Sequence, residues 1–312
     1  MLRPISRFLD DGNPDGRLHL QHGPVDLIIG VDDAVRTGLD GSLLRKKAFD
    51  AARTRFKTVL EELVGELALL RAPANKHAKR PSGAVAMRMM QAVSPFAESH
   101  FITPMAAVAG AVADEIISAM LLAFDAGEGP SRIYVNNGGD ISLHIDQSSE
   151  FRIRMASESG VSLGDFAIAG TSPSRGIATS GRGGRSLSMG IADSVTIIAA
   201  TAAAADAAAT IVANAVDLPD HRQVRRARAT DVVDDSDLGE RMVVVDCGPL
   251  DEDEIDRALS AGAAQAKRLL DADLIHRAAL FLKNRGRLVV PGEGPHHQVI
   301  LHNAQTGATF DA

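Results

Sequence analysis

The stretch GIATSGRGGRSLSMGIADSVTIIAATAAAADAAATIVAN, from Gly176 to Asn214, is the most informative part of this chain. It holds a glycine-rich turn with two arginines, a short β-type run, and a segment in which ten of the fifteen residues 199–213 are alanine. Alanine is the best helix former and has nothing beyond Cβ, so such a helix lets another element or a flat ligand approach its backbone. Asp206 and Thr210 interrupt the alanines and, four residues apart, share one helical face. This pattern predicts a site for a phosphate-bearing ligand and a hard metal ion.

Composition and charge exclude several classes of protein. The 312 residues suffice for a full core, and 45% hydrophobic with 23% charged residues is ordinary globular composition. A formal net charge of −7 disfavours a general nucleic-acid binder, which needs a basic surface to release counterions. The single cysteine, Cys247, excludes an intramolecular disulfide framework and a cysteine-based metal centre. We find neither a signal-peptide core nor an uncharged apolar run of about 20 residues, so we expect a cytoplasmic protein with no membrane partner.

The order of apolar patterns predicts an α+β fold. Expected strands cover 18–20, 25–31, 133–135, 141–145, 151–155, 242–245, 278–282, 288–290 and 298–302, and expected helices cover 42–70, 87–93, 105–124, the alanine-rich segment and 251–272. A charged linker is expected from Asp217 to Arg241. Strands and helices do not alternate regularly, so we expect hairpins rather than βαβ units. No linker is long enough to demand two domains, and 1–312 is therefore expected to be one domain.

Three short motifs have residue types suited to ligand binding, and each also has a plain structural explanation. NNGGD (136–140) has two glycines that let a ligand approach the backbone, but Asn-Gly is also the strongest short hairpin signal. ATSGRGGR (178–185) offers backbone N–H groups and arginines to a phosphate, or is a surface loop. DAAAT (206–210) offers a carboxylate and a hydroxyl to magnesium, or a threonine bonded to its own turn beside a solvated aspartate.

In this order, and with PMAAVAGAVAD (104–114) and GRSLSMGIADSVTI (184–197), the motifs resemble the ApbE-like superfamily. The resemblance is strong over the motif core, 104–214, and rests on element order in the flanks. Within the superfamily the sequence looks most like a compact branch rather than the FAD:protein FMN transferases proper. The resemblance implies a T-fold-like, ApbE-type domain with antiparallel sheets, long buried helices and a site for FAD and magnesium.

Carried over by motif, the site residues are as follows. The metal ligands would be Ala178 through its carbonyl, Asp206 and Thr210, and the nucleotide would be approached by Gly138, Gly139, Asp140, Thr179, Ser180 and Gly181. The transferases also carry a histidine and an Asp-Pro pair before the metal aspartate. Here only the eleven residues 182–192 separate Gly181 from Asp193, and none is histidine. The remaining catalytic candidates are Asp193, Arg182 and Arg185.

Three functions stay open at this point. The first is an FAD- and magnesium-dependent FMN transferase or pyrophosphate hydrolase, whose partners would be a nucleotide-type small molecule and an acceptor protein. The second is an accessory ApbE-like protein that binds without transferring and serves another pathway, such as sulfur or homocysteine metabolism. The third is a structural protein, with or without homo-oligomer formation, in which the alanine-rich helix is packing surface.

Overall fold

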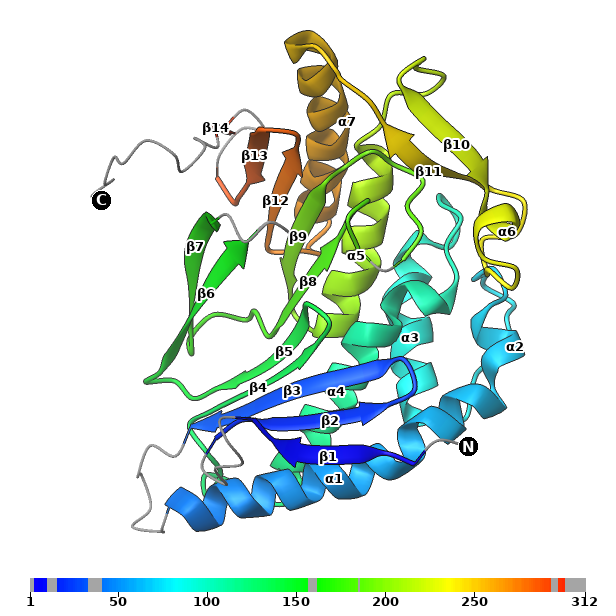
Figure 1. Cartoon of the computed structure of the whole chain (residues 1–312). Coiled ribbons are helices and arrows are strands. Elements are labelled where there is room, and N and C mark those ends of the chain that lie inside the picture. Colours follow the sequence, from blue (N-terminus) through cyan, green and yellow to red (C-terminus); the bar gives the residue numbers. More distant parts are fainter. Residues whose placement is uncertain are drawn as a thin grey trace.

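The computed structural model contains one large antiparallel sheet with helices packed against it (Figure 1). It describes residues 3–9, 16–32, 41–156, 162–184, 186–292 and 297–300. In spatial order the strands of this sheet are β1 (Ile5–Phe8), β2 (Leu18–His22), β3 (Val25–Asp32), β4 (Arg132–Asn137), β5 (Asp140–Ile145), β8 (Gly176–Ser180), β9 (Ser194–Ala199), β12 (Arg277–Leu282), β13 (Arg285–Val289) and β14 (His297–Ile300). Neighbouring strands pair antiparallel throughout this part of the chain. The predicted α+β class is therefore confirmed, while the T-fold assignment stays a prediction.

Two hydrophobic clusters join the helices to the sheet. The helices are α1 (Gly41–Gly65), α2 (Leu67–Leu70), α3 (Ala84–Val93), α4 (Val108–Leu121), α5 (Ala202–Ala215), α6 (Ala229–Val232) and α7 (Glu252–Asp271), with 3-10 turns η2 (Ser94–Phe96) and η3 (Pro104–Ala107). One cluster packs α1, α3 and α4 on β2, β3 and β4 around Phe49, Phe56 and Met120. The other packs α5 and α7 on β8, β9 and β12. The two clusters meet where α4 contacts the beginning of α5.

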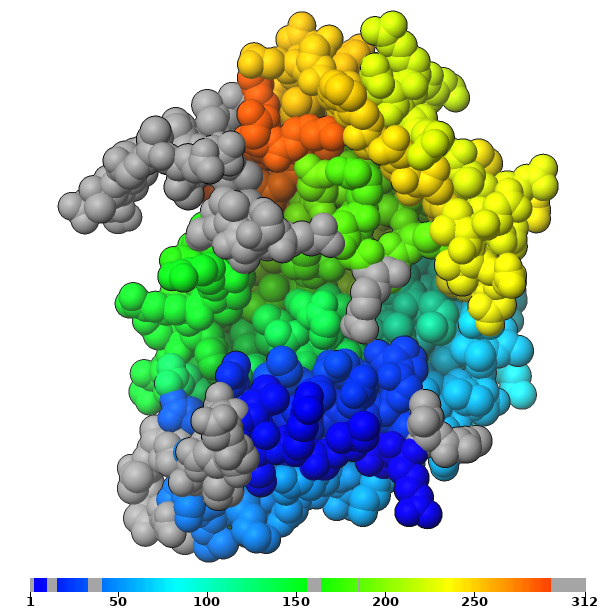
Figure 2. All heavy atoms as spheres, in the orientation of Figure 1, coloured from blue at the N-terminus to red at the C-terminus, as the bar shows by residue number. Residues whose placement is uncertain are grey.

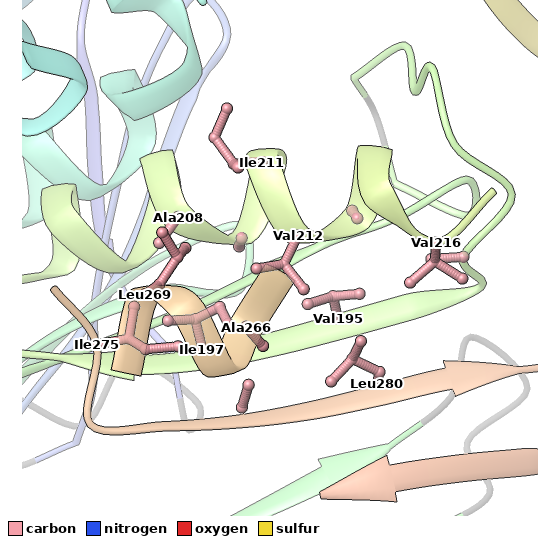
Figure 3. Close-up of a cluster of buried hydrophobic side chains, with 14 of the residues drawn as sticks. Val195, Ile197, Ala208, Ile211, Val212, Val216, Ala266, Leu269, Ile275 and Leu280 are labelled. Carbon is pink, nitrogen blue, oxygen red and sulfur yellow. The ribbon is translucent and has the colours of Figure 1, made fainter. Parts of the chain in front are cut away.

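Helices α5 and α7 pack side by side on the same face of the sheet (Figure 3). Val212 of α5 faces Val195 and Ile197 of β9, and Leu269 of α7 packs in the same cluster. The small side chains of α5 allow this close packing. Three glycines lie very near the α5 backbone. A Cβ added to Gly110 of α4 would lie 2.3 Å from the Ala202 oxygen, and one added to Gly176 of β8 would lie 2.0 Å from the Thr201 carbonyl carbon. A Cβ added to Gly190 would lie 2.2 Å from the Ala213 oxygen. The alanines are thus used for close approach of other elements.

The opposite face of the central strands is covered by a small sheet. It consists of β6 (Glu150–Ala156) and β7 (Ser162–Ala169), which pair antiparallel. Ile168 of β7 packs in one cluster with Leu143 of β5 and Ile177 of β8. Strand β7 was not expected, because its Gly164 and Asp165 interrupt the apolar pattern.

The prediction of a charged linker from Asp217 to Arg241 is wrong in part. This segment contains β10 (Val224–Arg228) and α6, and β10 pairs with β11 (Met242–Cys247). The three arginines of β10 hide the strand pattern, and one of them, Arg226, pairs with Asp217 at 2.5 Å. Figure 2 shows the yellow α6 region at the edge of the molecule beside cyan helices, where Asp235 pairs with Arg71 at 2.8 Å.

The long helices were predicted in place but not in detail. The expected helix 42–70 is divided after Gly65 into α1 and α2, and 105–124 begins as the 3-10 turn η3 and continues as α4. Within the described residues, one helical stretch, Pro104–Leu121, is long and apolar enough to cross a membrane, and 61% of it is buried in the protein. This stretch is a buried core helix, as its apolar surface on most faces predicts.

Candidate functional site

NNGGD forms a tight hairpin between β4 and β5, so the turn interpretation is confirmed. Gly138 and Gly139 have φ angles of +67° and +112°, which favour glycine. The Asn136 side-chain oxygen accepts a hydrogen bond from the Gly139 N–H at 2.8 Å. A Cβ added to Gly139 would meet nothing within 4 Å, so one side of the turn is open to an approaching group.

Asp140 connects this turn to β8. Its buried carboxylate accepts a hydrogen bond from the Thr179 N–H at 3.2 Å. In β5, Ser142 faces α4, where its hydroxyl donates to Asp114 at 2.7 Å. Asp140 is two residues earlier, so its side chain lies on the same face of the sheet, toward α4 and α5. The GGD turn and the TSG motif therefore adjoin.

Asp206 projects from α5 toward the first turn of α4. Its Oδ2 accepts a hydrogen bond from the Gly110 N–H at 3.0 Å. Burial, followed by the negative charge of Asp140, raises the pKa of Asp206 well above its usual range. The side chain is densely surrounded by protein atoms, although part of the residue's surface stays accessible. Two carboxylates from distant motifs thus come within electrostatic reach of each other.

A third carboxylate, Asp114 of α4, was not among the predicted site residues. It accepts hydrogen bonds from the N–H groups of Ala202 at 3.1 Å and Ala203 at 2.9 Å, in the first turn of α5. Because Asp206 bonds in turn to the first turn of α4, each helix supplies a carboxylate to the beginning of the other. The sequence signal that could have identified Asp114 is that it is the single acidic residue of the apolar motif 104–114. Only the fold shows that its carboxylate binds the N–H groups of α5.

Thr210 lies one turn beyond Asp206, and its hydroxyl has no hydrogen-bond partner among the described residues. Helical hydroxyls elsewhere in the chain donate to the carbonyl four residues earlier, as Thr54 does at 2.8 Å and Ser260 at 2.6 Å. The structural explanation for Thr210, a bond to its own turn, is therefore not observed. The Thr210 oxygen is available to a ligand.

The TSG motif is the end of strand β8 rather than a loop. Thr179 shares a face with Ile177, which packs under the small sheet, and its hydroxyl contacts that of Thr196 at 3.0 Å. Thr179 therefore offers the site its backbone, not its hydroxyl. Ser180 lies on the other face, the one on which Ala178 packs against α5. Gly181 has a φ of +155°, and a Cβ added there would lie 2.5 Å from the Asp193 carbonyl oxygen.

The two described catalytic candidates are paired with each other. Arg182 donates to Asp193 at 2.6 Å, and the Lys283 backbone N–H donates to the other oxygen of the same carboxylate. The Asp193 N–H also bonds to the Phe281 carbonyl, at 3.0 Å. This network joins β8 and β9 to the β12–β13 hairpin. Arg185 lies outside the described residues.

Comparison with known proteins identifies the family. A family model described as AbpE bacteria matches residues 6–290. The chain belongs to this family. The match confirms the ApbE-related family expected from the motifs, and the compact branch stays a prediction.

Sequence relatives are named UPF0280 proteins. The one from Methanothermobacter thermautotrophicus is 38% identical over 139 residues, 44% of this chain and 51% of that protein. The relative from Methanopyrus kandleri is 37% identical over 166 residues, which are 52% of this chain and 61% of that protein. The relative from Methanoregula boonei is 40% identical over 127 residues, which are 39% of this chain and 50% of that protein. The chain thus spans about half the length of the curated relatives it matches.

The donor set at the ApbE-related site suits a hard cation. Among the described residues, no three His, Cys, Asp or Glu side chains gather to hold a metal. What is present is oxygen: the carboxylates of Asp140 and Asp206, the Thr210 hydroxyl and nearby backbone carbonyls. Zinc prefers nitrogen and sulfur, whereas magnesium takes one or two carboxylates and completes its shell with water or substrate phosphates. The residues fit magnesium, and a carbonyl ligand from Ala178 stays a prediction.

Proposed function

We propose that this protein binds FAD together with Mg²⁺ where the β4–β5 turn, the end of β8 and α5 meet. The observation that supports this most is the closeness of Asp140 and Asp206, since the charge of one raises the pKa of the other. A divalent cation would neutralise this repulsion. It would also give a pyrophosphate a positive partner, which is how Mg²⁺ is commonly held in nucleotide sites.

Three neighbouring features support a nucleotide rather than a bare ion. The open side of Gly139 leaves room for a flat group beside the turn. The unbonded Thr210 hydroxyl adds an oxygen on the same helical face as Asp206. The Arg182 guanidinium lies just beyond β8. It carries a positive charge and could donate a hydrogen bond to a phosphate oxygen.

A second candidate function is flavin binding without transfer, and the hydrogen bonds made by the Asp193 carboxylate favour it. Both of its oxygens accept hydrogen bonds, one from Arg182 and one from the Lys283 N–H. Protein donors therefore already occupy both carboxylate oxygens, and the transferase histidine has no counterpart in the sequence between Gly181 and Asp193. An accessory, flavin-holding role is therefore the second proposal, and FMN transfer would require this pair to open.

The test of binding is thermal unfolding with FAD, FMN or neither, with and without MgCl₂. Ligand at 100 times its Kd stabilises the folded state by about 2.7 kcal/mol, roughly 4 °C in Tm for a domain of this size. We expect the full shift only with FAD and Mg²⁺ together. Asp206→Asn, which keeps an oxygen for the Gly110 N–H, should lose the shift, and Asp253→Asn, an exposed acid of α7, should keep it. No shift with any flavin would rule out the proposed function.

Transfer is measured separately from binding. Protein, FAD and Mg²⁺ are incubated with a threonine-containing acceptor, and AMP is followed by chromatography. AMP release that Asp206→Asn abolishes supports the transferase. A flavin-dependent Tm shift without AMP supports the accessory role.

A further inference from the structure

A second site lies at the other end of β8. A cavity of about 470 Å³ is bounded by the loop before β8, the end of α7 and the start of β12. Ser174 and His276 both line it. At about 3.3 Å per strand residue, Ser174 lies roughly 20 Å from Ser180, so this cavity is separate from the proposed FAD site.

Ser174 and His276 form a hydrogen-bonded pair in this cavity. The Ser174 Oγ lies 2.8 Å from the His276 Nδ1. Ser172 completes a chain, because its Oγ accepts the Ser174 N–H at 3.2 Å and donates to the Ser174 Oγ at 3.1 Å. In the His276 tautomer that carries its proton on Nε2, the Ser174 hydroxyl donates to Nδ1. This arrangement leaves His276 as the proton acceptor.

Rigid elements hold both partners. The segments that carry Ser174 and His276 are both hydrogen-bonded to the end of β9. The Ile198 carbonyl accepts a hydrogen bond from the His276 N–H at 2.7 Å, and the Ala199 carbonyl accepts one from the Arg175 N–H at 3.1 Å. The Arg175 guanidinium donates to the carbonyls of Ser172 at 2.6 Å and Ser174 at 2.7 Å. The loop is therefore fixed with a positive charge beside the serine. Ser174 is 5% exposed, whereas His276 is half-buried.

A serine within hydrogen-bond reach of a histidine, in a cavity with a rigid frame, is the arrangement of an activated nucleophile. The chain contains a useful contrast in Ser99 and His100. Their Oγ and Nδ1 atoms are also 2.8 Å apart, but the two residues are sequence neighbours on the exposed surface. Asp271 and Asp273 border the cavity without bonding to His276, so within the part of the chain that the structure describes the site is a pair and not a triad.

We propose that Ser174 is a nucleophile that takes the acyl group from a small carboxylic ester, with His276 as its base. The Ser174 Oγ attacks the ester carbon, forming an O–C bond while its proton passes to Nδ1. The C–O bond to the alcohol then breaks, and the alcohol oxygen takes that proton. Water attacks the acyl-serine with the same proton route, releasing the acid and restoring Ser174. Ester and water give acid and alcohol, and no other reactant is consumed. Leu270 and Ile275 supply the apolar wall for the acyl group.

The test uses the full chain with a fluorophosphonate probe and p-nitrophenyl acetate. We expect one covalent adduct, mapped by peptide mass spectrometry to Ser174, and absent from Ser174→Ala. Removing a general base costs about 10²- to 10⁴-fold, so His276→Gln should slow labelling at least about 100-fold. Ser99→Ala should label at the wild-type rate.

Two results would overturn the proposal. One is wild-type protein that acquires no adduct at Ser174 under conditions in which a known serine hydrolase is fully labelled. The other is a folded His276→Gln variant, checked by circular dichroism, that labels as fast as wild type. Should Ser174→Ala fail to fold, the mapped position of the wild-type adduct decides alone. Neither outcome depends on FAD binding.

Discussion

Replacing Asp114 with alanine should destabilise the protein strongly, because this carboxylate holds the start of α5 against α4. It accepts three hydrogen bonds, from the N–H groups of Ala202 and Ala203 and from the Ser142 hydroxyl. All of these groups are buried, so no water replaces the lost acceptor. A buried donor left unsatisfied costs about 1–3 kcal/mol.

The expected loss is smaller than three such costs added together. Burial raises the pKa of Asp114, which means that the charged carboxylate is itself unfavourable there, and the substitution removes that penalty. Neighbouring hydrogen bonds are also not additive. We therefore expect about 3–5 kcal/mol for Asp114→Ala, a large part of the roughly 5–15 kcal/mol that stabilises a typical domain. Asp114→Asn keeps one acceptor oxygen and should lose about 1–2 kcal/mol.

Urea unfolding at neutral pH measures these differences, provided the slopes with denaturant stay equal. The exposed Asp253, in the first turn of α7, is the matched control, and Asp253→Ala should cost no more than about 1 kcal/mol. A loss below about 1 kcal/mol for Asp114→Ala would refute the argument that its carboxylate secures the α4–α5 junction. The folded Asp114→Asn variant should also respond less to FAD and Mg²⁺, because Asp206 lies on α5, the helix whose first turn Asp114 holds.

Three further predictions concern other sites. Gly110→Ala would place a Cβ 2.3 Å from the Ala202 oxygen and should lower stability by about 1–3 kcal/mol or more in urea unfolding, whereas Gly65→Ala meets nothing within 4 Å and should not. Backbone N–H groups at the start of α3 lower the pKa of Glu66 below 4.5, so its contribution is present above pH 4.5 and lost as pH falls through the folded-state pKa. Glu66→Gln should accordingly reduce Tm at pH 7 and not at pH 3, and equal Tm differences at both would contradict this. Burial raises the pKa of the Cys247 thiol, so native protein should react with iodoacetamide at pH 7 far more slowly than urea-unfolded protein, as followed by mass spectrometry.

The sequence predicted most of the secondary structure because burial leaves a periodic trace. Strands β2 to β5 and helices α1, α4 and α7 have continuous apolar faces, and each was expected near its observed place. Strand β10 was not, since Arg225, Arg226 and Arg228 give an edge strand no hydrophobic signal. The end of β8 was assigned to a loop because threonine, serine and glycine in TSG are typical of turns. Their extended conformation comes from pairing with β9, a contact that local sequence does not encode.

The candidate site shows the same limit. Helical spacing pointed to Asp206 and the family resemblance to Asp140, but their mutual proximity depends on how α5 crosses β5 and β8. The pairing of Arg182 with Asp193 likewise depends on the fold, and it changes the chemistry expected of both. Asp114 was overlooked because an acid in an apolar helix is equally consistent with a solvated position until its partners are known.

The packing explanation accounts for the alanines of α5 but not for its polar pair. Close approach by Gly110, Gly176 and Gly190 requires small residues along the helix, and alanine meets that need fully. Asp206 does not serve packing, because burial and the charge of Asp140 both disfavour its ionised form. Its bond to the Gly110 N–H could be made by a neutral residue at lower cost, as helix starts commonly show with serine or asparagine. A bound positive charge would offset the repulsion between Asp206 and Asp140, so the ligand hypothesis for α5 rests on Asp206 rather than on the alanines around it.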